Sequence, residues 1–404
     1  MPTTVVERYG SLSATGFAKE TTFGTPVTAT TFVPMTGNSL ELDPGLFGPK
    51  VMFGQRDVNT FPLYGQYKNA GSLNFPLFPT MGLALLAGSI GADGAVGSGV
   101  TGTGSASPNT LNGATIAGAT TVTLTSATGY TNGSFIQVDV NGTGPTTTAE
   151  VRKITNVSTN TLTLDTALVY AHANGAATKV VTAPFTHSIT QANTLPSFTV
   201  EKNLGNFESL QFAGAKVNKF DLQVSNGNSE AACSVDLMAK SAAVLATPTA
   251  ITVTNESPYV FAECTTSFNS QSITQTTSAE VTVENGLKDT YTFNASHNLQ
   301  FLTPVTLKVS GKTDLVFTSL DDATWGYWTQ MTAGTTGALS VALTHPASAG
   351  AVTLSMPKAV IRTSTDAVKM DDVIITTLNF DAYLNLSTLQ TITATVVNAN
   401  WLAY

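Results

Sequence analysis

The sequence has few charged residues. Only 11% of its 404 residues are Asp, Glu, Lys or Arg, against about a quarter in an ordinary soluble domain. The missing charge is replaced mostly by Thr, Ser, Asn and Gly. A dissolved monomer usually keeps a well-charged surface, so this composition favours a chain that loses much of its surface to partners. A secreted or thermally robust β-protein with an uncharged polar surface is the alternative that composition leaves open.

Cysteine is nearly absent, with only Cys233 and Cys264. Two thiols form no disulfide framework; they are favoured to be free and either buried or half-buried, although their pairing is left open. The formal net charge is -8, and no dense Lys/Arg cluster occurs. Because nucleic-acid binders carry a basic patch, DNA that meets this chain is expected to slide past without specific binding.

Long apolar runs and targeting signals are also missing. The first residues lack the basic start and apolar core of a signal peptide. The longest apolar run, around residues 81–90, is far below the ~20 residues of a membrane span. The sequence therefore predicts a chain made in the cytoplasm, with no membrane partner.

Recognisable catalytic, cofactor and metal-binding motifs are absent as well. The sequence has no Walker-type loop, no His-Glu-x-x-His helix and no Cys-x-x-Cys pair. Residues 97–102 match the dinucleotide-binding Gly pattern, but without the strand before it and the helix after it that the site requires. The histidines lie far apart and near no carboxylate cluster; they are His172, His187, His297 and His345. We therefore expect no catalytic residues, no cofactor, no metal and no enzymatic activity.

The abundant residues point to an all-β protein. Thr and Val favour strands, whereas Asn and Gly favour turns. Short alternating runs occur along the chain, and residues 71–78 place Leu73, Phe75 and Leu77 on one face of a strand. Only two short helices are expected, at residues 80–87 and 321–331.

The most distinctive stretch is residues 17–90. An extended arm reads Lys-Glu-Thr-Thr-Phe-Gly-Thr at 19–25, and a strand end reads Leu-Glu-Leu-Asp-Pro-Gly at 40–45. A loop punctuated by Gly and Pro follows at 44–62, then a strand and a helix. This order resembles the opening of the tail tube proteins of long-tailed, siphovirus-like bacteriophages. The resemblance is strong over the first quarter of the chain and rests on architecture beyond it.

The resemblance implies a structural subunit of a phage tail tube. Such a subunit is a virion protein of the tail, assembled in the host cytoplasm, and its rings stack into a conduit for DNA. The implied partners are further copies of the chain, a tape measure protein and a tail terminator. The resemblance favours a stacking loop at residues 44–62 that inserts into an adjacent subunit; a loop folded back over its own core is the alternative. Contacts between subunits or rings are expected at Phe23, Phe47, Phe53, Arg56, Asp57, Phe61 and Tyr64.

The second half of the chain resembles the first. Residues 71–77 align without gaps to 311–317, and both stretches lead to a helix candidate. Two tandem tail-tube β-sandwich or barrel folds are therefore expected, although any two β-rich halves align loosely. Family rings carry six copies of the fold, so a duplicated chain implies homotrimeric, pseudo-hexameric rings. The expected divisions are an arm at 1–37, a first fold at 38–90 and 185–250, an inserted module at 108–183, and a second fold at 251–404.

The inserted module is expected to decorate the outside of a tube. Residues 91–107 consist almost wholly of small residues and predict a flexible linker. Four short alternating strands between residues 110 and 182, separated by Asn-Gly and similar turns, predict an Ig-like sandwich or small barrel.

An alternative function is a β-rich surface adhesin or carbohydrate-binding virion protein. It would use the inserted module and a sugar-stacking platform at Trp325, Tyr327 and Trp328, although core or interface packing is the favoured use of these aromatics. A polysaccharide depolymerase ranks third because no acid pair is recognisable.

Overall fold

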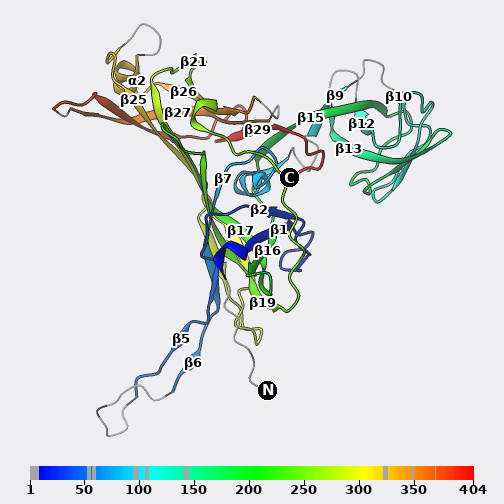
Figure 1. Ribbon diagram of the computed structural model, residues 1–404, viewed down its shortest axis with the longest axis horizontal. Helices are drawn as coiled ribbons and strands as arrows, with labels where there is room; N and C mark the ends of the chain where they lie inside the picture. The colour runs from blue at the N-terminus through cyan, green and yellow to red at the C-terminus, as the bar shows by residue number, and fades with distance from the viewer. Residues whose placement is uncertain are drawn as a thin grey trace. The chain divides into compact units, whose positions relative to one another are not determined.

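The computed structural model in Figure 1 consists mostly of antiparallel β-strands. It describes residues 9–51, 56, 61–93, 100–104, 109–140, 145–321, 326–346, 350–368 and 370–404. Within these residues there are two α-helices, α1 (Leu83–Ile90) and α2 (Tyr327–Ala333), and two 3-10 turns, Gly10–Leu12 and Phe261–Glu263. The prediction of an all-β fold with two short helices is confirmed.

The chain forms two compact units. Unit 1 contains Met1–Ser89, Asn193–Pro258 and Glu280–Gly311, and unit 2 contains Ile90–Ala192, Tyr259–Ala279 and Lys312–Tyr404. Two strands, β22 (Thr276–Glu284) and β25 (Lys308–Val316), each begin in one unit and end in the other.

Unit 1 is organised around its longest strand, β17. The first half of β17 pairs with β16 and β19, and its second half pairs with β18, which in turn pairs with β7. Strand β1 pairs with β16 and β2, and strands β3 and β4 pair with β7. The strands are β1 (Ala14–Lys19), β2 (Thr31–Val33), β3 (Gly37–Asn38), β4 (Glu41–Asp43), β5 (Leu46–Phe47), β6 (Leu63–Tyr64), β7 (Lys68–Pro76), β16 (Phe198–Leu204), β17 (Glu208–Ser225), β18 (Ala232–Ala239), β19 (Ser241–Leu245), β23 (Leu287–Thr290) and β24 (Phe301–Pro304).

Part of the expected N-terminal arm belongs to this sheet. Strand β1 forms a ladder with β16, in which Phe17 lies opposite Val200. The carboxylate of Glu20, only 8% exposed, then accepts hydrogen bonds from four donors. They are the backbone N–H groups of Gly24 (2.8 Å) and Gly214 (2.8 Å) and the hydroxyls of Ser197 (2.7 Å) and Thr199 (2.9 Å). The start of the arm is thus fixed to its own unit.

Unit 2 contains a sheet and a small module. In the sheet, β26 pairs with β20 and β27, and β27 continues to β28 and β29. Its strands are β20 (Cys264–Phe268), β21 (Gln271–Ser272), β26 (Thr336–Thr344), β27 (Ala351–Ala367), β28 (Ile375–Ala382) and β29 (Thr393–Asn398). The module and the strands leading to it are β8 (Gly91–Asp93), β9 (Val100–Gly104), β10 (Asn109–Thr110), β11 (Thr121–Thr123), β12 (Phe135–Val140), β13 (Pro145–Ser158), β14 (Thr161–Leu164) and β15 (Ala177–Gln191).

The Gly-rich stretch predicted as a flexible linker is ordered where it is described. Strands β8 and β9 both pair with β15, so the prediction is wrong for these residues. Glycine allows β9 to lie close to the side chains of β15: a Cβ on Gly102 would lie 2.7 Å from the Cβ of Val181. The dinucleotide-like pattern falls partly outside the described residues, and its last residues belong to β9.

The stem of the module leaves and re-enters the fold at one place. The backbone N–H of Ala192, after β15, donates to the carbonyl of Ile90, at the end of α1, at 3.2 Å. The module itself has its own hydrophobic core. The core side chains are Leu111, Val122, Leu124, Tyr130, Ile136, Val138, Ile154, Leu162, Leu164 and Leu168.

The same ladders recur in the two halves of the chain. The pairings of β17 with β16, β18 and β19 match those of β27 with β26, β28 and β29. Strand β1 pairs with β16 as β20 pairs with β26. Strands β18 and β28 each have 8 residues, and β7 and β25 each have 9.

The irregularities of these ladders recur too. The β17–β18 register shifts around Asn218, and the β27–β28 register shifts at the same point, around Arg362. Beyond these strands, Leu77 N–H donates to Ala231 (2.8 Å), and at the same position of the second half Phe317 N–H donates to Ile374 (2.9 Å). Residues at the same place in the two sets of ladders are called corresponding positions below.

A hairpin projects before β7 and before β25. The first consists of β5 and β6, and the second of β23 and β24. Each begins with a glycine at positive φ, Gly45 (56°) and Gly286 (50°). A Cβ would lie 2.4 Å from the carbonyl of Gln66 at Gly45, and 2.7 Å from the hydroxyl of Thr306 at Gly286. Only glycine fits both the backbone conformation and this close approach.

Candidate assembly surface

The hairpin β5–β6 carries the largest group of predicted contact residues. Leu46 lies opposite Tyr64 and Phe47 opposite Leu63, and these side chains are 60%, 61%, 53% and 43% exposed. Phe61, next to them in the sequence, is 59% exposed. Apolar side chains gathered on an exposed hairpin are typical of a protein–protein contact.

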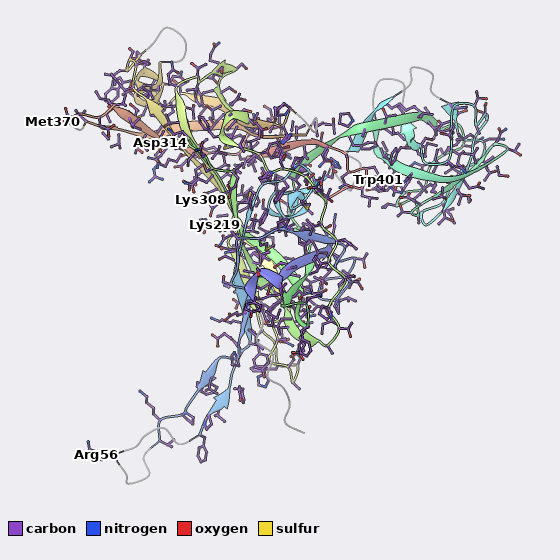
Figure 2. All side chains as sticks on the ribbon, in the orientation of Figure 1. Arg56, Lys219, Lys308, Asp314, Met370 and Trp401 are labelled. Atoms are coloured by element: carbon purple, nitrogen blue, oxygen red, sulfur yellow. The ribbon has the colours of Figure 1, made fainter. Side chains whose placement is uncertain are left out.

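The other predicted contact residues differ in their surroundings. Arg56 lies at the far end of the hairpin (Figure 2), whereas Phe53 and Asp57 lie outside the described residues. Phe23 is half-buried in unit 1, and the ammonium groups of Lys216 and Lys240 lie 5.0 and 5.4 Å from the centre of its ring. In the single chain, therefore, Phe23 already contacts its own unit.

The second hairpin braces the base of the first. The ring of His297 stacks on Tyr67 with 4.9 Å between ring centres, and its Nδ1 lies 2.7 Å from the carbonyl oxygen of Gly65. The hydroxyl of Tyr291 donates to the carbonyl of Tyr67 at 2.8 Å. Burial, together with the charge of Asp289, raises the pKa of Tyr291 to about 12, so this hydroxyl remains a donor at neutral pH.

Strands β17 and β22 join the two halves of the chain within unit 1. The backbone N–H of Asn285 donates to the carbonyl of Asn218 at 2.8 Å. Three residues away on each strand, the hydroxyl of Thr282 donates to the carboxylate of Asp221 at 2.6 Å. The two contacts run in opposite directions along the strands, as in an antiparallel ladder.

Charged side chains lie close together around Asp221 on β17. The ammonium group of Lys219 lies 2.6 Å from the Asp221 carboxylate. The hydrogen bond and charge of Asp221, with the charges of Asp236 and Glu280, raise the pKa of Lys219 despite partial burial. One cation thus faces three carboxylates. We call the side chains of Lys219, Asp221, Asp236 and Glu280 the polar face of unit 1.

Unit 2 has a similar group around Asp314 on β25. Its carboxylate accepts from the hydroxyls of Ser278 (2.7 Å) and Thr377 (2.6 Å), and Lys312 lies 3.4 Å away. Burial alone would raise the pKa of Asp314, but these hydrogen bonds and the Lys312 charge lower it overall. Asp314 therefore stays ionised at neutral pH.

The histidines were predicted to lie near no carboxylate cluster, but two of them do contact carboxylates. The Nδ1 of His187 lies 2.5 Å from Asp93, and the Nε2 of His172 lies 3.1 Å from Glu150. These partners are far apart in the sequence, which hid the contacts. Even so, no group of three or more His, Cys, Asp or Glu side chains among the described residues has the geometry to hold a metal ion.

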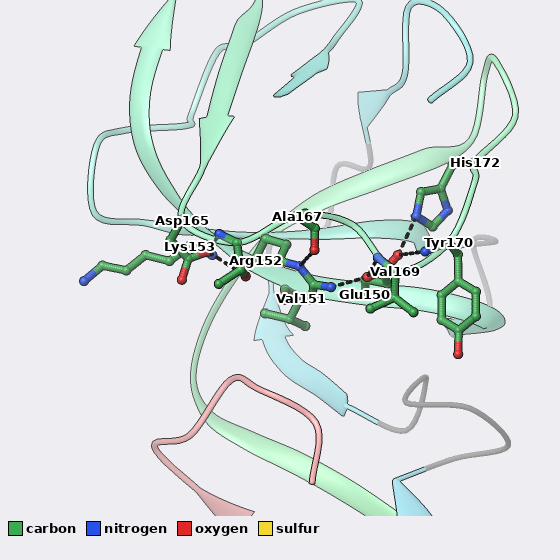
Figure 3. A network of polar contacts seen from close by, with 10 residues as sticks. Glu150, Val151, Arg152, Lys153, Asp165, Ala167, Val169, Tyr170 and His172 are labelled. Atoms are coloured by element: carbon green, nitrogen blue, oxygen red, sulfur yellow. Dashed lines mark hydrogen bonds and ion pairs between the residues drawn. The ribbon is translucent and has the colours of Figure 1, made fainter. Parts of the chain in front are cut away.

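Glu150 is the centre of a buried network in the module (Figure 3). Its carboxylate accepts from the backbone N–H groups of Val169 and Tyr170, both at 2.8 Å, and contacts the guanidinium of Arg152. Burial raises the pKa of Glu150, but the hydrogen bonds from His172, Val169 and Tyr170 and the charge of Arg152 lower it below its ordinary value of 4.5.

The lowered pKa predicts acid sensitivity of the module. Because the folded pKa of Glu150 lies below its unfolded value, its contribution to stability is complete above about pH 4.5 and is lost as the pH falls through the folded pKa. The protection factors of β12–β14 in hydrogen–deuterium exchange, corrected for the intrinsic effect of pH on amide exchange, should therefore fall several-fold in acid. Glu150→Gln should be less protected at neutral pH and lose this acid-dependent change. An unchanged pH profile in the Gln variant would contradict the assignment.

The aromatic cluster proposed for the adhesin is not a shared platform in the described residues. Tyr327 is 4% exposed, whereas Trp328 is 42% exposed, and Trp325 lies outside the described residues. A stacking platform needs open ring faces, which Tyr327 does not offer.

The fold and these surfaces define an all-β structural protein. A family model described as phage tail tube protein matches residues 10–382. The chain belongs to the phage tail tube protein family and is a component of the virion tail, which confirms the resemblance seen in the sequence. No curated protein matched the chain. None of the described helices is long and apolar enough to cross a membrane.

Proposed function

We propose that this chain polymerises as stacked trimeric rings, each with two copies of the tube fold per chain, and that the stack is the conduit for phage DNA. The proposal rests chiefly on the recurrence of the β16–β19 ladders in β26–β29, including the register shifts at Asn218 and Arg362. Independent strands have no reason to share such irregularities, because a bulge is a local feature of one strand pair. Two folds per chain and six per ring require three chains.

The number of chains per ring tests this proposal. Class averages of end-on rings, together with the mass of the smallest ring in mass photometry, should give three chains and sixfold pseudosymmetry. Rings of six chains would show that the recurrence does not reflect two tube folds per chain.

We propose further that the polar face of unit 1 and the group around Asp314 in unit 2 line the conduit. Phosphates moving along such a wall meet carboxylates, and the cations Lys219 and Lys312 are already paired with Asp221 and Asp314. A lysine that is already paired with a carboxylate binds phosphate weakly, because binding phosphate would break its own ion pair. This arrangement suits passage of DNA without specific binding.

The inserted module is proposed to lie on the outside of the tube and to be dispensable for assembly. Gly104 on β9 lies opposite Val181 on β15, so a two-residue Asn-Gly turn joining them replaces residues 105–180 and closes a hairpin. The shortened chain should still form tubes, with a smaller outer diameter in electron micrographs. A folded product that forms no tubes would place the module in the wall. A loop replacement within the module, such as Gly-Ser for residues 113–118, is the matched control.

A further inference from the structure

The junction between β17 and β22 has a counterpart that the single chain leaves empty. In this chain, the β17–β22 junction is a strand contact from the first half to the second. A closed ring of such chains needs the matching contact from the second half of one chain to the first half of the next. The recurring ladders identify the residues of that second contact.

The strand of the second half that corresponds to β17 is β27. The register shift at Asn218 recurs at Arg362. Counting three residues along each strand, Asp221 corresponds to Thr365. Residues 361–367 pair with β28 on one side, and among the described residues no ladder is recorded on their other side. We call this other side the β27 edge.

The strand of the first half that corresponds to β22 is β4. The hairpin glycines Gly286 and Gly45 follow β22 and β4 respectively, so Thr282 corresponds to Glu41. Among the described residues, β4 pairs with β7 on one side and with no strand on its other side. We call its other side the β4 edge.

Exposure distinguishes the occupied junction from the empty one. Val283 of β22 is fully buried at 0%, whereas Leu42, its counterpart on β4, is 41% exposed. All three residues of β4 are exposed, and so is Thr365 on β27. An unpaired strand edge with an exposed apolar side chain is suited to pairing with another chain.

The chemistry of the two edges is complementary. At the occupied junction the Thr282 hydroxyl donates to Asp221; at the empty one Glu41 offers the acceptor and Thr365 the hydroxyl, so donor and acceptor have exchanged strands. Arg362, with a side chain 65% exposed, lies next to this position and already forms an ion pair with Asp381 of its own chain at 3.2 Å. Pro44 corresponds to Asn285 but has no N–H, so the ladder ends at Asp43.

We propose that the β27 edge of one copy pairs antiparallel with the β4 edge of the next copy, with Glu41 opposite Thr365, and that this contact closes the ring. The inference rests on the proposed function, since it supplies the contact that ring formation requires. Its occupant is a second copy of this chain.

Disulfide trapping of the variant Glu41→Cys/Thr365→Cys tests the pairing. Residues directly opposite in an antiparallel ladder have Cα atoms about 4.5–5.5 Å apart, within the range that a disulfide spans. Native thiols contribute little background: Cys233 is buried and burial raises its pKa, and burial raises the pKa of Cys264 to about 11. Asp221→Cys/Thr282→Cys, at the occupied junction, is the matched control and should form a disulfide within one chain.

The expected result is covalent dimers and trimers, and nothing larger, on non-reducing gels of assembled protein, with neither single variant cross-linking. Rings in electron micrographs without cross-links, while the control disulfide forms, would overturn the pairing but leave the proposed function intact. An absence of rings and tubes in the wild type at every concentration would overturn the proposed function and the pairing with it.

Discussion

Glu20→Ala is expected to lower the stability of unit 1 by about 3–4 kcal/mol, because its four donors lose a buried acceptor. Each unsatisfied buried donor costs about 1–3 kcal/mol, and the losses are not additive since the side chain acts as one anchor. With about 2–4 °C per kcal/mol for a unit of this size, the unfolding midpoint should fall by roughly 10 °C in differential scanning calorimetry.

Two control variants distinguish the loss of the Glu20 hydrogen bonds from the loss of a negative charge in general. Glu208→Ala removes an exposed carboxylate of β17 and should change stability by less than about 0.5 kcal/mol. Glu20→Gln keeps one oxygen acceptor and should fall between the wild type and the alanine variant. Equal midpoints for Glu20→Ala and Glu208→Ala would contradict the role of Glu20 in fixing the start of the arm.

His187→Ala should destabilise unit 2 by about 3–5 kcal/mol, because it removes the imidazole from the buried Asp93 carboxylate and leaves it the backbone N–H of Ser188 at 3.1 Å. Both side chains are 0% exposed. The Nδ1 of His187 lies 2.5 Å from Asp93 and its Nε2 lies 2.9 Å from the carbonyl of Asn400. The pair therefore fixes β8, β15 and the C-terminal segment together.

A double-mutant cycle with Asp93→Ala measures this coupling. The double variant should lose less stability than the sum of the single variants, since removing both partners leaves no unpaired buried charge. Trp401→Ala is a comparison within the same segment: its indole lies 5.1 Å from the Phe135 ring and donates to Asp165 at 3.3 Å. Additive losses for His187 and Asp93 would show that the pair does not act as a unit.

Much of the strand pattern could be predicted because alternation is a local property. Leu73, Phe75 and Leu77 were predicted to share one face of a strand, and they are 0%, 2% and 1% exposed. The four strands predicted in the module also occur, as β11–β14. The Gly-rich linker was misjudged because glycine signals both flexibility and close packing, and only the position of β15 decides between them.

The candidate site was less predictable. Exposed aromatics of the hairpin at Phe47, Phe61 and Tyr64 follow from a long apolar loop that lacks a core of its own. The buried carboxylates Glu20 and Glu150 could not be anticipated, because their partners converge from distant segments. No signal in a single sequence distinguishes such an acid from one on the surface.

Negative-stain electron microscopy of the purified protein over a concentration series shows whether this chain assembles by itself into a tube. Rings that stack into hollow tubes are expected as concentration rises, each ring built from three chains with sixfold pseudosymmetry. Discrete particles at every concentration, particularly ones that bind glycans, would contradict it and favour the adhesin.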